Sequence, residues 1–364
     1  MTGIRSLLFR AFALLVVTSV IVVGCGPRAP ATLTKIVFVQ AHTDPIAGED
    51  SPMYAIPQEF GYFKQEGLEV EWQFSKGSAE AIQLLLAGNA QLANANAESV
   101  FTTRSQGGPV KAVFAVKGRS GYYIGLLPDS PVQKLEDLKG KTIGVSTMGS
   151  AAVPIITSAL ADVGLQKDTD YQMVAAGSGA QAAAAITGKK VDALGLWDSA
   201  YAVVENQGIK LRYIDMPIQA QLAPYTLAAT DDYIKQHPDI IKGFCRAWVK
   251  GFTWAIANPQ GAVAIFYKYF PASKPSGIPE ATAIQQDAHV VEAWMVNASK
   301  FQEPLWGQLY PEKWAFGQQY YTKLGLIKQQ LDPTQYYTND FVKACNDFNK
   351  DALREQAKKY VIGK

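Results

Sequence analysis

Short apolar runs alternate with helical patterns over the first two thirds of the chain. Runs such as KIVFVQ are apolar enough for strands buried on both faces. The predicted strands are 35–40, 68–74, 110–116, 122–127, 141–146, 171–175 and 211–214. Between them lie helical patterns, including 53–63 and 151–163, and the chain after residue 230 is mostly helical. This alternation indicates an α/β protein with parallel sheets.

One unit of the pattern occurs twice. The copies are 78–101 (SAEAIQLLLAGNAQLANANAESVF) and 178–201 (SGAQAAAAITGKKVDALGLWDSAY). Each predicts a small-residue turn, a helix, a Gly stop, a short strand and a polar or aromatic tip. The offset is too long for a solenoid and suits two similar lobes. Ligands of open α/β sheets bind beyond the carboxyl ends of strands, so we expect the tips to lie at a binding site.

The N-terminal segment carries the features of an export signal. Arg5 and Arg10 precede an apolar run that ends at Cys25, which predicts a signal peptide over 1–24. The sequence VVGC resembles a bacterial lipobox, so we expect Cys25 to be acylated and to begin a lipid-anchored linker over 25–32. An ordinary signal peptide and an uncleaved anchor are the alternatives.

Composition places the rest among ordinary globular proteins. The chain has 364 residues, 48% hydrophobic and 18% charged, which is enough for two domains. Without Arg5 and Arg10, the 34 basic residues fall to 32 and balance the 32 acidic ones, and no basic stripe remains for nucleic acid. Cys245 and Cys345 form no CxxC or Cys/His cluster, so no metal site is predicted. A disulfide between them and buried free thiols are both open.

Four motifs resemble the periplasmic solute-binding proteins of ABC importers. They are GYFKQEGLEVEW (61–72), KLEDLKGKTIGV (134–145), GKKVDALGLWDSAY (188–201) and TDDYIKQHPDIIKGF (230–244). The resemblance is to the branch for alkanesulfonates, taurine, nitrate and the pyrimidine precursor of thiamine. It covers residues 35–257 well and the C-terminal third weakly. The branch often has Trp-Asp/Glu-Pro where this chain has Trp-Asp-Ser at 197–199.

The resemblance implies an α/β, two-lobed periplasmic binding protein fold of type II, with two parallel-type sheets and two hinge crossings. Lobe 1 would comprise 33–125 and 224–364, and lobe 2 would comprise 126–223. It also implies a monomeric lipoprotein of the cell envelope, in the periplasm or on the outer face of the membrane. Such a protein captures a small organic anion and delivers it to a membrane permease and its ATPase, without catalysis or a cofactor.

The turn after the predicted strand 141–146 is the candidate anion site. Thr147, Gly149 and Ser150 follow a strand and open a helix, so backbone N–H groups and the helix dipole can hold an anionic group. Ser178 begins a similar turn, and the alternative for both turns is ordinary helix capping. The turn carries no Arg or Lys. We therefore expect a sulfonate-like acid bound by backbone groups.

Polar and aromatic residues at the tips and crossings complete the candidate site. Trp197 is a pocket wall or part of the core, and Asp198 accepts a ligand amine or caps the next turn. The first lobe and the crossings would supply the remaining contacts. The candidate ligand-binding residues are His42, Asn96, Glu98, Tyr122, Thr147, Gly149, Ser150, Ser178, Trp197, Asp198, Tyr201 and Tyr225.

Three other functions remain open. The first is binding of a thiamine pyrimidine precursor or a related heterocycle. The second is an enzyme on the same fold, of the pyrimidine-precursor synthase type; its Cys-rich signature is absent, because Cys245 and Cys345 stand alone. The third is a surface adhesin or receptor component, which would not need paired helix-start turns facing a cleft. The sequence does not name the ligand.

Overall fold

The computed structural model describes residues 32–300 and 305–363. The chain divides into the units Met1–Thr32 and Leu33–Lys364, and the second unit contains all of the helices and strands described below. The predicted signal peptide and Cys25 lie outside the described residues. Within the described part, no helix has the length and apolar character needed to cross a membrane.

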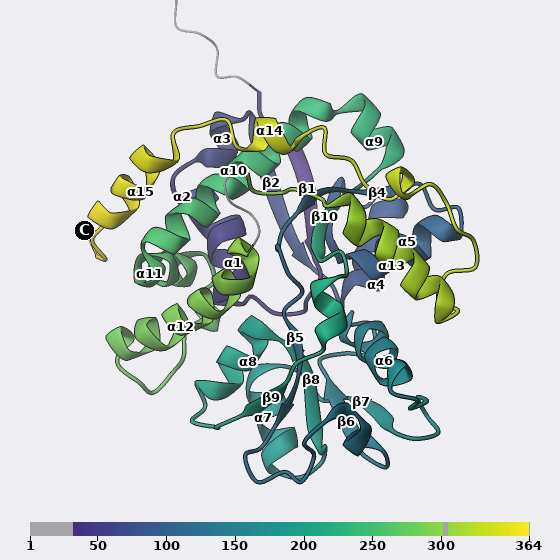
Figure 1. Cartoon of the computed structure of the whole chain (residues 1–364). Coiled ribbons are helices and arrows are strands. Elements are labelled where there is room, and N and C mark those ends of the chain that lie inside the picture. The colour runs from purple at the N-terminus through teal and green to yellow at the C-terminus, as the bar shows by residue number, and fades with distance from the viewer. Residues whose placement is uncertain (1–31, 301–304, 364) are drawn as a thin grey trace, which may run out of the picture. The chain divides into compact units, whose positions relative to one another are not determined.

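Two five-stranded sheets form the framework (Figure 1). The first has the order β2-β1-β3-β10-β4, with β1 (Thr34–Gln40), β2 (Leu68–Phe74), β3 (Leu92–Asn96), β4 (Val110–Ala115) and β10 (Tyr225–Thr230). The second has the order β7-β6-β8-β5-β9, with β5 (Tyr122–Leu126), β6 (Thr142–Val145), β7 (Gln172–Ala175), β8 (Ala193–Trp197) and β9 (Arg212–Ile214). We call the parts built on these sheets the first and second lobes. The predicted fold class is confirmed.

Each sheet is mixed, where the sequence predicted parallel-type sheets. In the first sheet β10 runs antiparallel between β3 and β4, and in the second β5 runs antiparallel between β8 and β9. Both strands follow a passage of the chain from the other sheet. They enter from the end at which the neighbouring strands finish, and therefore run in the opposite direction.

The repeated unit is present in the structure. In the first lobe it forms α4 (Ser78–Leu86), β3 and α5 (Ala97–Ser105), and in the second it forms α7 (Gly179–Thr187), β8 and α8 (Asp198–Glu205). The strands β3 and β8 are each the third, central strand of their sheet. The tips follow these strands directly in the sequence, so both tips lie at strand ends as predicted.

The predicted helix 53–63 is instead a broken segment. Helical residues begin earlier, in α1 (Ala47–Asp50), continue through a π-helical turn, η1 (Ser51–Ala55), and then form α2 (Ile56–Glu59) and α3 (Tyr62–Gln65). Proline lacks an N–H group, so Pro52 and Pro57 disturb the regular α-helical bonding. Gly61, at φ 65°, separates α2 from α3.

The other helices cover the sheets. Before β10 they are η2 (Leu135–Leu138), α6 (Ala152–Asp162) and η3 (Pro217–Ala220). After β10 they are α9 (Asp231–Gln236), α10 (Pro238–Ala257), α11 (Pro259–Tyr269), η4 (Pro271–Ser273), α12 (Glu280–Ser299), α13 (Pro311–Lys323), η5 (Pro333–Gln335), α14 (Val342–Cys345) and α15 (Lys350–Lys359). The apolar face of α10 packs into the first-lobe core, where Trp248 and Phe244 contact Phe38 of β1.

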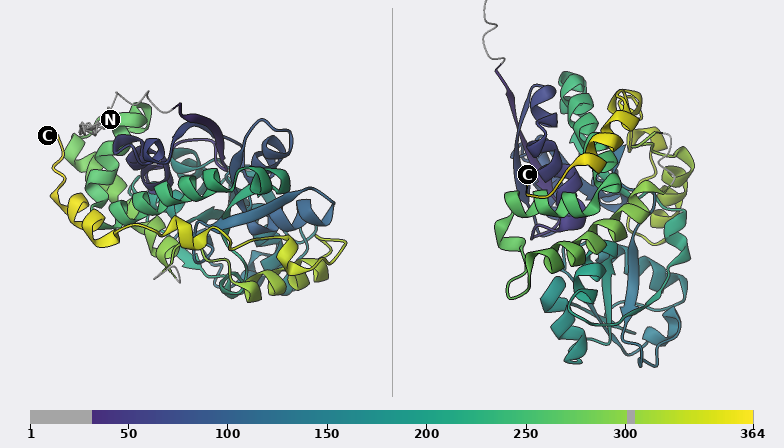
Figure 2. Two further views of the ribbon diagram at one scale, coloured as in Figure 1. Left: turned by 90° about the horizontal axis from the view of Figure 1, so that it is seen from above. Right: turned by 90° about the vertical axis from the view of Figure 1, so that its left-hand side faces the viewer.

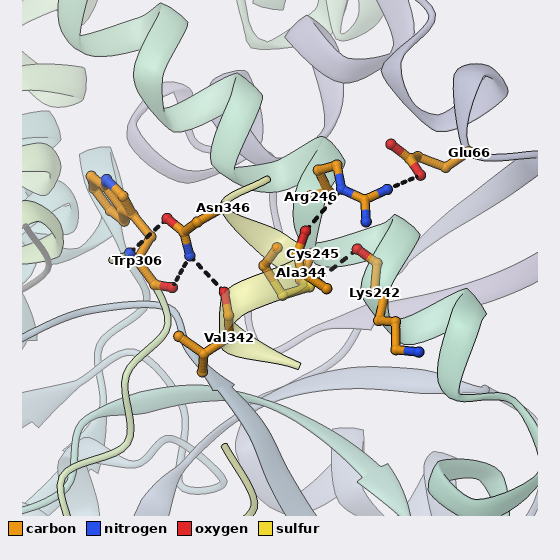
Figure 3. Close-up of a disulfide and its surroundings, with 9 residues drawn as sticks. Glu66, Lys242, Cys245, Arg246, Trp306, Val342, Ala344 and Asn346 are labelled. Carbon is orange, nitrogen blue, oxygen red and sulfur yellow. Dashed lines mark hydrogen bonds and ion pairs between the residues drawn. A yellow bond between two sulfur atoms is a disulfide. The ribbon is translucent and has the colours of Figure 1, made fainter. Parts of the chain in front are cut away.

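A disulfide joins Cys245 of α10 to Cys345 of α14 (Figure 3). Next to it, Arg246 donates to the Ala344 carbonyl and pairs with Glu66. Helices α14 and α15 both lie along α10 (Figure 2). Of the two alternatives for these cysteines, the structure has the disulfide, and it fastens the C-terminal segment to the first lobe.

Helix α12 contacts both lobes. It packs against α11 and α1 on one side and against α8 on the other. Asn206 of the second lobe donates to the Gln286 carbonyl, and Asn297 donates to Asp198 at 3.0 Å. The C-terminal third was expected on the first lobe, and α12 reaches beyond it to pack against α8 of the second lobe.

Candidate functional site

A small cavity of about 30 Å³ lies where strand ends of both sheets meet. We call it the inner cavity. Its lining comes from the segments after β1 and β4, from α1, and from the ends of β3, β5, β8 and β10. The lining residues are Ala41, His42, Glu49, Asn96, Lys117, Ser120, Gly121, Tyr122, Trp197 and Tyr225. This is the position at which open α/β sheets bind ligands.

Aromatic rings form facing parts of the wall. The rings of His42 and Trp197 are 6.4 Å apart between centroids, with an interplanar angle of 28°. Tyr122 lies 6.2 Å from Trp197, and Phe74 lies 5.6 Å from His42. His42 and Phe74 belong to the first lobe, whereas Tyr122 and Trp197 belong to the second. A ligand here would therefore contact aromatic rings from both lobes.

Glu49 joins the two lobes inside this wall. Its Oε1 accepts hydrogen bonds from Trp197 Nε1 at 2.6 Å and from Ser199 Oγ at 3.0 Å. Its Oε2 lies 3.5 Å from His42 Nε2. Burial is the largest single influence and would raise the pKa of the Glu49 carboxyl, but the charges of His42 and Lys117 and the hydrogen bonds from His42 and Ser199 together hold this pKa below its usual value. Glu49 is thus a buried carboxylate.

His42 is held in its protonated form. Nδ1–H donates to the Asp44 carbonyl at 2.8 Å, and Nε2 faces the carboxyls of Glu49 and Asp50. Burial opposes the charge, but the two carboxyls raise the pKa of His42 to about 9. Burial raises the pKa of Asp50 to about 6, although Ile46 N donates to it at 2.8 Å.

Lys117 and Asp198 form a second buried pair. Lys117 Nζ lies 2.7 Å from Asp198 Oδ1, and Asn297 Nδ2 donates to Asp198 Oδ2. Burial raises the pKa of Asp198, and the Lys117 charge opposes this rise. Ser199 N also donates to Asp198. A proline at 199 could donate neither this N–H bond to Asp198 nor the hydroxyl bond to Glu49. Ser199, where the branch often has proline, therefore makes two hydrogen bonds that proline could not make.

The structure gathers five of the predicted residues at the inner cavity: His42, Asn96, Tyr122, Trp197 and Tyr225. Asp198 lies behind the wall, where Lys117 and Asn297 occupy its oxygens. Tyr201 lies inside the second lobe, where its hydroxyl accepts from Gly125 N and Leu196 N. These bonds tie α8 to β5 and β8, which is a packing role.

Glu98 is buried beside the wall and does not line the cavity. Among the described residues its Oε1 has no hydrogen-bond partner, and burial raises its pKa to about 8. The carboxyl is therefore largely protonated at neutral pH, as expected for an acid without a cationic neighbour.

The predicted anion turn contacts the opposite lobe directly. Thr147 Oγ1 donates to the Lys76 carbonyl, and Ser150 Oγ accepts from Ala152 N. A Cβ added at Gly77, whose φ is 139°, would lie 2.4 Å from the Gly149 carbonyl oxygen. Glycine is therefore required at 77, where the two lobes meet. Gly149 and Ser150 are absent from the lining of the inner cavity.

A second, larger hollow lies along the same boundary between the lobes. It measures about 580 Å³, and we call it the outer cavity. Thr147 and Ser178 of the predicted set belong to it. Its lining residues are Thr43, Asp44, Pro45, Ile46, Ser146, Thr147, Gly177, Ser178, Gly179, Ala180, Gln181, Ala200 and Val203.

The family follows from comparison with known proteins. Residues 51–262 match the model of the family described as NMT1/THI5 like. The chain belongs to the NMT1/THI5-like family. The matched segment contains both copies of the repeated unit, Trp197 and Lys117, and the resemblance inferred from the sequence is confirmed.

Relatives of this NMT1/THI5-like protein are named as binding proteins. The riboflavin-binding protein RibY of Chloroflexus aurantiacus is 23% identical over 320 residues, 87% of this chain and 88% of that protein. The formylaminopyrimidine-binding protein of Halalkalibacterium halodurans is 26% identical over 213 residues, 57% and 63% of the two chains. The alkanesulfonate-binding protein SsuA of Xanthomonas axonopodis pv. citri shares the fold, with a TM-score of 0.59 and 16% identity. The match covers 85% of this chain and 99% of that protein.

Sequence reasoning missed two central residues of this NMT1/THI5-like site. Glu49 and Lys117 line the inner cavity but were not among the candidates. Lys117 directly follows a predicted strand, and that position was the available signal. Glu49 had a weaker signal, an acidic pair with Asp50 shortly after the first strand. Among the described residues, no group of three or more His, Cys, Asp or Glu is arranged to hold a metal ion.

Proposed function

We propose that the protein is the solute-binding component of an ABC importer and that its inner cavity binds a planar nitrogen heterocycle. The observation that carries the proposal is the buried Glu49 carboxylate between the facing rings of His42 and Trp197. A carboxylate accepts hydrogen bonds and donates none. It therefore suits a ligand that presents N–H groups at the edge of a flat ring.

The ring spacing supports a flat ligand. Two van der Waals contacts, one on each face of an inserted ring, require about 7 Å. The His42 and Trp197 centroids are 6.4 Å apart and their planes differ by 28°, so the lobes would have to separate for a ring to enter between them. Tyr122 would close its edge. Riboflavin and formylaminopyrimidine, named for two relatives, both contain planar nitrogen heterocycles with N–H groups.

The charge balance supports a neutral ligand. His42 faces the carboxylate of Glu49, and Lys117 is paired with Asp198 at 2.7 Å. Each cation at the cavity thus already has a buried anionic partner. An anionic ligand would have to compete with Asp198 for Lys117, and a displaced buried carboxylate is costly.

A small organic anion of the sulfonate type is the second candidate. The protonated imidazole of His42 on the cavity wall favours it, with a pKa of about 9. The turn from Thr147 to Ser150, which the sequence pattern favoured for the anion, lies beside the outer cavity and would bind it there only through backbone groups.

Export and anchoring complete the proposal. The apolar run before Cys25 supports a signal peptide, and VVGC supports acylation of Cys25. The mature protein would then work in the cell envelope as a lipid-anchored monomer that delivers ligand to the permease and its ATPase. Metabolic labelling with a fatty acid tests the anchor. Equal label on the wild type and on Cys25→Ser would rule it out.

Calorimetry and thermal shift with two ligand panels test the ligand class. One panel contains formylaminopyrimidine, its unformylated amine and riboflavin, and the other contains taurine, ethanesulfonate and nitrate. A heterocycle at 100 times its dissociation constant should stabilise the fold by about 2.7 kcal/mol. Binding of the anions without any heterocycle would overturn the proposal in favour of the second candidate.

A further inference from the structure

The outer cavity begins where the inner cavity ends. Along the segment after β1, His42 lines the inner cavity, and Thr43 to Ile46 line the outer one. Along the opposite wall, Trp197 lines the inner cavity, and Ala200, one turn into α8, lines the outer one. The two hollows are therefore neighbours along one boundary between the lobes. A substituent on a ring held at His42 and Trp197 could therefore extend into this hollow.

The outer cavity has a mixed lining, with apolar side chains beside polar groups and no cation among the described residues. Hydroxyl or amide groups come from Thr43, Ser146, Ser178 and Gln181, which lie on both lobes. No Lys or Arg belongs to the described lining, and Asp44 adds a carboxylate. Such a surface offers hydrogen bonds to hydroxyl groups and disfavours a phosphate or carboxylate.

We propose that the outer cavity binds a neutral, hydroxyl-bearing tail carried by the heterocycle of the inner cavity. The inference rests on the proposed function, which it extends by naming the second half of the ligand. Riboflavin has this composition, a planar ring system with a hydroxylated chain. Cytidine has it on a single ring. A volume of about 580 Å³ is ample for either tail.

Matched pairs of compounds test the tail. Riboflavin is compared with lumiflavin, and cytidine with cytosine, so that each pair shares a ring and differs in the hydroxylated group. Calorimetry should show the tailed compound of a binding pair at least ten-fold tighter than the bare ring. Riboflavin 5′-phosphate and cytidine 5′-phosphate should bind more weakly than their uncharged parents. Tighter binding of the phosphates would overturn the assignment of a neutral tail.

A cavity-filling variant separates the two cavities. Ala180 is exposed at the start of α7 and lines the outer cavity, so Ala180→Phe places a ring in it without changing a residue of the inner lining. The variant should remove the ten-fold advantage of the tail and leave the bare ring within two-fold of the wild type. Ala184→Phe is the matched control, because Ala184 is exposed one turn further along α7 and does not line the outer cavity.

The outcomes distinguish this inference from the proposed function. If neither ring binds in any form, the proposed function fails and the inference with it. If bare and tailed compounds bind equally, or if Ala180→Phe weakens both members of a pair alike, the tail subsite is wrong and the ring site stands.

Discussion

Trp197 Nε1 donates to Glu49 Oε1 at 2.6 Å, across 148 residues of sequence. The bond joins the tip of the second-lobe repeat to α1 of the first lobe. It lies in the wall of the inner cavity, so one carboxylate takes part both in contact between the lobes and in the surface offered to a ligand. Changes at either residue should therefore affect binding more than folding.

Replacing Glu49 with Gln should weaken heterocycle binding by about 1.5–3 kcal/mol, the scale of a hydrogen bond to a charged group. The amide keeps the size of the side chain but removes the charge that faces His42. Calorimetry measures the loss. The exposed Glu312→Gln serves as the control, and equal affinities for the two variants would argue against a ligand contact at Glu49.

Truncating Trp197 to Ala should weaken binding by about 1–3 kcal/mol, because a large apolar surface leaves the wall. Trp197→Phe retains a ring and loses only the N–H bond to Glu49, so it should recover most of the affinity for a flat ligand. A Phe variant as weak as the Ala variant would show that the bond, not the ring, determines binding.

Gly77→Ala should reduce ligand affinity at least ten-fold, because the new Cβ would lie 2.4 Å from the Gly149 carbonyl oxygen of the other lobe. Gly88→Ala is the control for a positive φ: Gly88 has φ 76° but open space around its Cβ position. Gly77→Ala carries the greater backbone strain as well as the contact, because φ 139° with ψ −178° is a conformation essentially restricted to glycine. Equal affinities in titration calorimetry would mean that the contact between 77 and 149 is irrelevant to binding.

Glu98 should make the protein less stable as pH rises. Burial raises its pKa from 4.5 in the unfolded chain to about 8, so between these values the folded state binds more protons than the unfolded state. The free energy of unfolding then falls as pH rises through this window, by up to about 1.4 kcal/mol per pH unit. Glu98→Gln removes this contribution.

Urea denaturation at pH 5 and pH 8 measures the effect. The wild type should lose stability between the two values, and Glu98→Gln should lose less. His42 contributes in the same direction above pH 6.5, because its raised pKa of about 9 stabilises the fold only while the ring is protonated. Identical pH dependence in wild type and variant would show that Glu98 ionises normally.

Removing the disulfide with Cys245→Ala and Cys345→Ala should cost about 2–5 kcal/mol of unfolding free energy. The bridge spans 100 residues and fastens α14 to α10, and neither cysteine lines the inner cavity. Ligand affinity should change by less than three-fold at a temperature where the variant is folded. A stability unaffected by the double substitution, measured by urea titration, would contradict this role.

The sequence predicted what depends on local pattern. Strand 68–74 has the predicted bounds, and the repeat with its Gly stops at Gly88 and Gly188 places β3 and β8 correctly. The direction of β5 and β10 was missed because hydrophobic pattern does not encode strand direction. Half of the site was also missed, since the importance of Glu49 comes from a partner 148 residues away. Tyr201 was placed in the ligand site from its position at a tip, whereas its hydroxyl turns inward to backbone groups.

Because β10 lies between β3 and β4, the order in which the strands are synthesised differs from their order in the first sheet. The strands of the second sheet lie within 122–214, so that sheet has all of its members before β10 emerges. The first sheet cannot be completed until residues 225–230 have been synthesised, because β10 pairs with both β3 and β4. Until then the earlier part of this sheet has exposed strand edges, a state in which incompletely folded chains aggregate. The first sheet can therefore be completed only after every strand of the second sheet has been synthesised.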